Sequence, residues 1–207
     1  MASEYELGNL ALYQGLMEEA KARALSINML SNDQRGIPSL FVREYCFLQL
    51  RMLCEIIGLS CLVAHGDLVA KISTSLRKKY APGEIIRALE RLHSDFYPVP
   101  VIPQQTATGW HLGEYDDRPF LTKQELPDLW NKCGDVLHRG SLKKLVDSKT
   151  PIQPSFSDVN DWGQKVLNLL SAHRIVTSNG QLSFVTFLQV DQLGGAVQVV
   201  LGEASSV

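Results

Sequence analysis

The 207-residue sequence is 45% hydrophobic, which is enough for one sizeable core, and 20 basic against 22 acidic residues give a net charge of −2. This near balance excludes a global field that would attract nucleic acid or an anionic membrane, so any nucleic-acid contact needs a local patch. Residues 1–10 lack the basic and apolar regions of a signal peptide, and the most apolar run, 56–64, is too short to cross a bilayer. We therefore expect a cytoplasmic protein that does not contact a membrane.

Two long helices are expected in the first third of the chain. Apolar residues recur at alternating three- and four-residue spacing over 4–32, which predicts an amphipathic helix. After a turn ending at Pro38, residues 39–67 are apolar almost all round, so this second helix is expected to be central and to be capped by Ser39. On its wheel Glu44, Arg51 and Glu55 share one narrow stripe, and Arg51 and Glu55 form an i, i+4 pair.

The middle of the chain mixes helical and extended patterns. A short helical pattern over 68–76 leads into a basic cluster, and Pro82 opens a helix that is expected to run to Phe96. Three prolines in residues 98–103 then predict polyproline-like extended chain and a long loop over about 97–121, because proline is excluded from helices and inner strands.

A further helix is expected after this loop. Thr122 and Glu125 have the spacing of a capping box, and Gly140 is a natural stop. Its core stripe is predicted to contain Trp130, while an adjacent polar stripe contains Asn131, Asp135 and His138.

The C-terminal part changes from helical to strand periodicity. Ser157 is expected to cap a helix, Asn179-Gly180 to form a type I′ hairpin turn, and 196–201 to form a third strand. The fold class is therefore mostly α: an antiparallel helical bundle with a small C-terminal antiparallel three-stranded β-meander. We divide the chain into a bundle over 1–150 and a helix plus meander over 151–207, packed together as one unit.

Few residues carry a chemical signal. His138 lies near a helix end and is followed by cations, which suits proton transfer near phosphate, or else its ring simply bonds the last free carbonyls. The Arg51–Glu55 pair either fixes helix register as a buried ion pair or, if its stripe faces that of His138, binds an anion and orients a reacting group. His93 and His173 lie on apolar faces of expected helices and are expected to be hydrogen-bonded core residues.

Common active-site motifs are absent from the sequence. It contains no Gly-rich phosphate loop, no GxGxxG, no HExxH and no GxSxG. The four cysteines show no CxxC pairing and are expected to be reduced and buried. We expect no cofactor and no metal.

An apolar helix with an internal Arg and Glu (LQLRMLCEIIGL), followed by a helix that ends in NKCGDVLHRG, resembles the HEPN superfamily of helical bundles. Many members cleave RNA without metal through an R-x4–6-H motif, act as toxins or antiphage factors, and dimerise. Here the window for the motif arginine holds Asn131, Lys132 and Cys133, and Arg139 follows the histidine instead.

The resemblance implies a homodimeric protein that binds RNA and, if it is an enzyme, a metal-independent ribonuclease. The alternative is a non-catalytic dimeric scaffold or partner-binding regulator. The site that it implies has three catalytic residues and five substrate-binding residues: His138, Arg51 and Glu55 for catalysis, and Arg139, Lys132, Lys143, Lys144 and Asp135 for binding.

Overall fold

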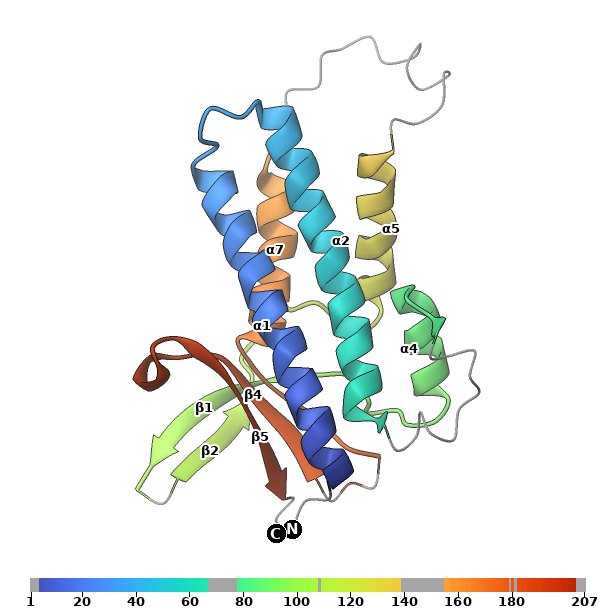
Figure 1. Cartoon of the computed structure of the whole chain (residues 1–207), viewed down its shortest axis with the longest axis vertical. Coiled ribbons are helices and arrows are strands. Elements are labelled where there is room, and N and C mark those ends of the chain that lie inside the picture. The colour runs from blue at the N-terminus through green and yellow to red at the C-terminus, as the bar shows by residue number, and fades with distance from the viewer. Residues whose placement is uncertain are drawn as a thin grey trace.

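The structure is a computed structural model that describes residues 4–66, 78–107, 109–138, 155–178, 180 and 182–203. These residues form five α-helices, one short 3-10 helix and five β-strands. In Figure 1 the helices α1, α2, α5 and α7 stand as an upright bundle, and the strands lie at its lower end. The fold is therefore mixed α/β, and the expectation of a mostly α protein with only a three-stranded meander is wrong.

The first two helices form an antiparallel pair, as the sequence predicts. Helix α1 spans Glu4–Asn32 and buries Tyr13 and Met17 on the face given by its apolar spacing. Helix α2 spans Ser39–Ala64, and the turn between them uses positive φ at Arg35 and Gly36. Ser39 does not cap α2, because its hydroxyl donates instead to Gln34 Oε1 at 2.7 Å.

Helix α2 runs through the middle of the bundle. By length and mean hydropathy (1.8) the whole helix is long and apolar enough to cross a membrane, whereas the expectation considered only its most apolar run, 56–64. However, 61% of that apolar window is buried inside the fold. Packing in the core therefore accounts for its hydropathy without a bilayer.

Three shorter helices complete the described helical part. Helix α4 spans Pro82–Glu90, with Pro82 in its first turn as predicted, and it ends six residues before the expected Phe96. Helix α5 spans Glu125–Leu137 and α7 spans Ser157–Leu170. The helix expected over 68–76 and the stop expected at Gly140 lie outside the described residues.

The five strands form one antiparallel sheet with the order β2-β1-β3-β4-β5. The last three, β3 (Ala172–Val176), β4 (Leu182–Val190) and β5 (Ala196–Glu203), are the predicted meander, with a 3-10 turn over Asp191–Leu193. The pairing of Val176 with Ser183 centres the β3–β4 hairpin on the expected Asn179-Gly180, and Gly180 has a positive φ of 69°. Asn179 lies outside the described residues, so the turn type stays a prediction.

Two strands form where a loop was expected. Strand β1 (Val99–Thr106) and strand β2 (Gly109–Glu114) make a hairpin, so the prediction of a long loop over about 97–121, polyproline-like at its start, is wrong. Strand β1 pairs with β3 only at Val99 and Pro100 and with β2 only from Val101 onward. Because the two pairings are staggered, most of β1 has a partner on one side only. The proline nitrogens, which carry no hydrogen to donate, can then lie on the side that has no partner strand.

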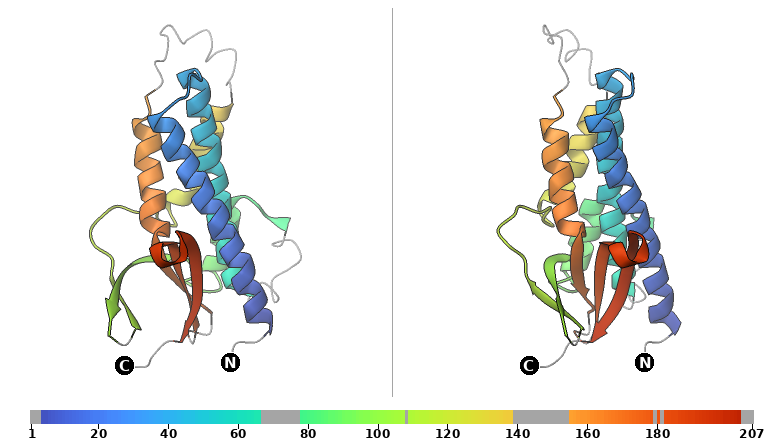
Figure 2. Two further views of the ribbon diagram at one scale, coloured as in Figure 1. Left: turned by 60° about the vertical axis from the view of Figure 1, so that its left-hand side comes forward. Right: turned by 90° about the vertical axis from the view of Figure 1, so that its left-hand side faces the viewer.

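One face of the sheet packs on α1, which also covers the edge of β5. The side chains of Gln14 and Glu18, one turn apart on α1, bond the carbonyl and the N–H of Val197. Figure 2 shows α1 running alongside β5. These two side chains replace the next strand, which leaves less of the β5 edge open to another chain.

Candidate functional site

Arg51 and Glu55 of α2 are joined to each other and to Trp130 of α5. Arg51 Nε lies 3.6 Å from Glu55 Oε1, and the guanidinium carbon lies 3.8 Å from the centroid of the Trp130 ring. The Trp130 indole N–H donates to the same Glu55 oxygen at 2.9 Å. The exposed fractions of the two charged side chains are 24% and 17%. Both charges therefore have partners within the protein, as in a structural ion pair that fixes how two helices meet.

A glycine on α5 makes room for this cluster. A Cβ built on Gly134 would lie 2.8 Å from an Arg51 guanidinium nitrogen, closer than such contacts normally come. The same guanidinium donates to the Trp130 carbonyl oxygen at 3.4 Å. Arg51 and Glu55 thus contact Trp130 and Gly134 on α5. They were expected to meet the neighbouring polar stripe of that helix, which contains Asn131, Asp135 and His138.

His138 lies just beyond the end of α5, where its backbone N–H donates to the Gly134 carbonyl at 3.0 Å. Its side chain is exposed and, in the described part of the chain, forms no hydrogen bond with Arg51 or Glu55. Four residues of helix rise separate Gly134 from His138, which is about 6 Å along the axis. The structure therefore places His138 about one helical turn beyond the glycine that Arg51 contacts, with no hydrogen bond between the two side chains in the described residues.

Of the remaining predicted site residues, the structure describes Asp135 and Lys132. Asp135 is exposed, and Lys132 is exposed with its Nζ 5.8 Å from the centroid of the Trp162 ring on α7. Arg139, Lys143 and Lys144 lie outside the described residues.

His173 is a hydrogen-bonded core residue, as expected, but it lies on β3 rather than on a helix. Its Nε2 is 2.7 Å from the Tyr13 hydroxyl, and its Nδ1 is 3.1 Å from the Leu170 carbonyl oxygen. The carbonyl can only accept, so Nδ1 carries the proton and Nε2 accepts from Tyr13. Burial lowers the pKa of His173 to about 4, which keeps the ring neutral near pH 7. This bond ties α1 to the sheet.

Two further histidines, His65 and His93, lie together where α2, the segment after α4, and β3 meet. The ring centroids of His65 and His93 are 5.3 Å apart, and a ring nitrogen of each lies within 3.1–3.3 Å of the Val176 carbonyl oxygen. His65 is fully buried, and its other ring nitrogen lies 2.8 Å from the Cys61 carbonyl oxygen. The pair holds three segments together at the end of β3.

The prediction that the cysteines are buried is confirmed, and all four are free thiols: Cys46, Cys54, Cys61 and Cys133. Burial raises the pKa of Cys46 to about 11 and that of Cys133 to about 12, so both stay protonated near pH 7. No group of three or more His, Cys, Asp or Glu side chains suited to a metal ion occurs in the described ranges.

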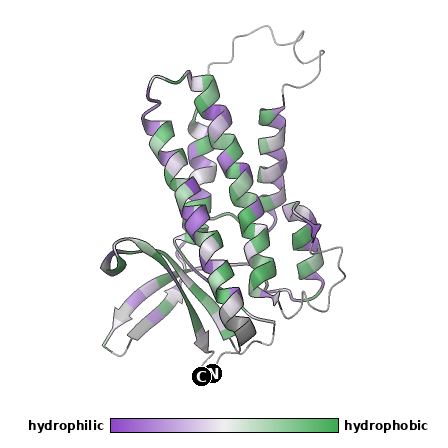
Figure 3. Cartoon of the chain, viewed as in Figure 1, coloured by the Kyte–Doolittle hydropathy of each residue, from purple (hydrophilic) through white to green (hydrophobic). Residues whose placement is uncertain are grey.

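The outer face of α2 carries an apolar row that sequence reasoning missed. Phe41, Tyr45 and Leu48 are 54%, 36% and 43% exposed, and their spacing places them on one side of the helix. Leu40 and Ile37 extend the apolar surface at the N-terminal end. Helix α2 lies between α1 and α5 in Figure 3, and most of its ribbon has the hydrophobic colour. Because the helix is apolar all round, its periodicity did not reveal which side stays open.

The comparisons with known proteins return no relative. No protein-family model, no curated protein and no solved structure matches the chain.

Proposed function

We propose that the chain acts as a homodimeric helical module whose two copies meet through the outer face of α2. The observation that carries this proposal is the exposed row Phe41, Tyr45 and Leu48. Large apolar side chains grouped on one face of a folded protein are typical of interaction surfaces, whereas scattered ones are ordinary. Aromatic residues at the centre of such a face are the residue types that dominate binding energy.

The row suits a second copy of the same chain because it carries no charge of its own. In a two-fold dimer the same patch meets itself, so an uncharged stripe avoids opposing like charges. In an antiparallel pair of α2 helices centred near Leu48, Glu44 would approach Arg51 of the other copy across the same flank. Glu44 is half-buried and has no ion pair among the described residues, so this contact would give it a partner.

The test is the molar mass in solution, measured by sedimentation or light scattering over a range of concentrations. The wild type is expected to be a dimer, and Phe41→Glu and Leu48→Glu are expected to be monomers. Leu48→Glu places a charge against its own copy near the two-fold axis, and Phe41→Glu buries a charge within the apolar contact. Leu25→Glu is the matched control, since Leu25 is a similarly exposed leucine (54%) on α1. A monomeric wild type, or dimeric Phe41→Glu and Leu48→Glu variants, would overturn the proposal.

RNA binding with metal-independent cleavage is a second candidate, in keeping with the HEPN resemblance. One observation favours it: the exposed imidazole of His138 lies one helical turn beyond Gly134, which Arg51 contacts. Here His138 would act as the acid/base and Lys132 and Arg139 as phosphate contacts. Arg51 and Glu55 would position α5 rather than touch RNA, because both are already held by Trp130.

This candidate is tested with purified protein and total RNA in the presence of a chelator. If His138 is the acid/base, the wild type degrades the RNA, His138→Ala does not, and His111→Ala, at an exposed position on β2, behaves like the wild type. Intact RNA with the wild type, or equal cleavage by His138→Ala, would leave only the non-catalytic dimer. The four free, buried thiols support a reducing, cytoplasmic location for either function.

A further inference from the structure

A cleft of about 460 Å³ lies at the junction of the sheet and the start of α5. Its floor comes from Val99 on β1 and from Arg174 and Val176 on β3. Its walls come from the segment before β1, with Asp95 and Tyr97, and from the segment before α5, with Phe120 and Lys123. The volume lies within the range of small-molecule sites. The cleft is at the opposite end of α5 from His138 and shares no lining residue with the α2 face.

Arg174 is the free cation of this cleft. It is exposed on β3, opposite Val99 of β1, and within the described chain its guanidinium has neither an ion pair nor a hydrogen bond. The other lining cation is already partnered, since Lys123 Nζ lies 2.9 Å from Glu90 Oε1. Asp95 also lines the cleft but forms no ion pair with Arg174. A guanidinium without a partner can bind a carboxylate or phosphate through two parallel hydrogen bonds.

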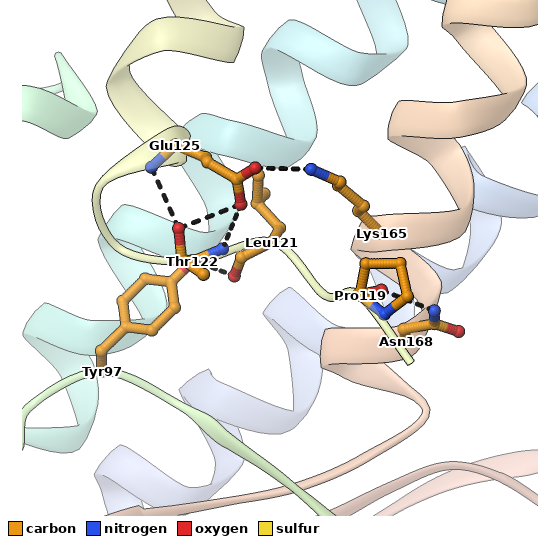
Figure 4. Close-up of polar contacts among 7 residues, drawn as sticks. All are labelled: Tyr97, Pro119, Leu121, Thr122, Glu125, Lys165 and Asn168. Atoms are coloured by element: carbon orange, nitrogen blue, oxygen red, sulfur yellow. Dashed lines mark hydrogen bonds and ion pairs between the residues drawn. The ribbon is translucent and has the colours of Figure 1, made fainter. Parts of the chain in front are cut away.

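The wall before α5 is held in place by bonds to three elements (Figure 4). Tyr97 donates its hydroxyl to the Leu121 carbonyl at 3.1 Å, and the Leu121 N–H donates to the Lys165 carbonyl on α7 at 3.0 Å. Thr122 and Glu125 form the predicted capping box, and Glu125 also pairs with Lys165 Nζ at 2.5 Å. The wall is therefore already held in one conformation, so ligand binding does not have to offset the conformational entropy lost in ordering it.

The rest of the lining is mainly apolar. Val99 and Val176 on the sheet and Phe120 on the wall offer surfaces for a flat apolar group, while Arg174 offers one charge. We infer that this cleft binds a small organic anion, whose carboxylate or phosphate head contacts Arg174 and whose flat apolar body packs on the valines and Phe120.

The experiment uses full-length protein and two pairs of probes in calorimetric or NMR titrations. Adenosine monophosphate is compared with uncharged adenosine, and 2-naphthoate is compared with 2-naphthalenemethanol. At least one anion is expected to bind, and its neutral partner about tenfold more weakly or not at all, since a charged hydrogen-bond pair is worth roughly 1.5–3 kcal/mol. Binding of the nucleotide alone would identify a phosphate ligand, and binding of naphthoate alone a carboxylate ligand.

Variants then locate the bound anion. Arg174→Gln is expected to lower the affinity for the anion at least about tenfold. Arg174→Lys keeps the positive charge but not the two parallel N–H donors, so it is expected to retain part of the wild-type affinity. Arg87→Gln is the matched control, because Arg87 is an exposed arginine on α4 that does not line the cleft. The Phe41→Glu variant should bind the anion like the wild type, so a failed dimer test leaves this result intact. Absence of binding by both anions, equal binding of their neutral partners, or unchanged affinity in Arg174→Gln would overturn the inference.

Discussion

Acidification should destabilise this protein through His173 specifically. The folded state holds the ring neutral, because Nδ1–H donates to Leu170 and Nε2 accepts from Tyr13 with no exposed surface. Burial lowers the pKa of His173 to about 4, whereas in the unfolded chain it is about 6.5. The unfolded state therefore binds more protons between these values. The stability that the neutral ring contributes is complete above about pH 6.5 and falls as the pH drops toward 4.

The size of the effect follows from the two pKa values. Between pH 7 and pH 5 the unfolded histidine becomes almost fully protonated, while the folded one stays mostly neutral. The linkage relation then gives a loss of about 2 kcal/mol in the free energy of unfolding from this residue alone. A loss of that size is a large part of the total stability of an ordinary domain.

Urea unfolding at pH 7 and pH 5 measures this loss. Other groups titrate over the same range, so the useful quantity is the difference between variants. His173→Gln should lose about 2 kcal/mol less than the wild type between the two pH values, because glutamine does not titrate. The control His138→Gln removes an exposed histidine and should follow the wild type. If wild type and His173→Gln show parallel pH dependence, His173 does not have a depressed pKa and the assignment of its protons is wrong.

Three further changes test contacts within and between the helices. Trp130→Phe removes the N–H that donates to Glu55 but keeps an aromatic ring, so the free energy of unfolding in urea should fall by about 1–2 kcal/mol. Thr122→Ala breaks the capping box of α5 and should cost about 1 kcal/mol, measured by thermal unfolding. Arg43→Gln removes the partly exposed 2.6 Å pair with Asp158 that joins α2 to α7, and should cost about 1 kcal/mol or less, declining further with added salt.

The first two changes have matched control variants, and the third is judged by its salt dependence. Trp162→Phe alters a half-buried tryptophan whose indole N–H donates to no group in the described part of the chain, so it should cost less than Trp130→Phe. Thr122→Ser keeps the capping oxygen and should restore most of the stability lost in Thr122→Ala. A salt-independent loss in Arg43→Gln would show that the arginine acts through its packing against the Phe47 ring, 4.7 Å from the guanidinium carbon.

The long periodic segments could be predicted from the sequence because their apolar spacing matches the packing that forms. Helix α1 has the expected bounds, and the meander and the Thr122–Glu125 capping box are where the pattern places them. The β1–β2 hairpin could not be predicted, because the penalty for proline in a sheet depends on which side has a partner. That information lies in β3, about seventy residues further along the chain.

The candidate site was predicted only in part because its geometry depends on how α5 is rotated. Arg51 and Glu55 do face α5, but they meet Trp130 and Gly134. A glycine in the middle of α5 was the available signal, since it marks where another side chain approaches the helix backbone closely. The exposed side of α2 had no such signal. Phe41 and its neighbours are apolar like the core residues of α2, and they differ only because no other element of the described chain packs over them.

The contact of α1 with β5 has a consequence for how the chain folds. Gln14 bonds to Val197 across 183 positions, and Tyr13 bonds to His173 across 160. During synthesis α1 can pack on α2 early, but the part of α1 that faces the sheet must wait, without its native cover, until the last strand has been made. Such long closures slow folding and leave apolar surface open to aggregation or to chaperones in the interval. They also join the first and last elements of the chain, so cleavage of the segment between them should leave two fragments that stay associated.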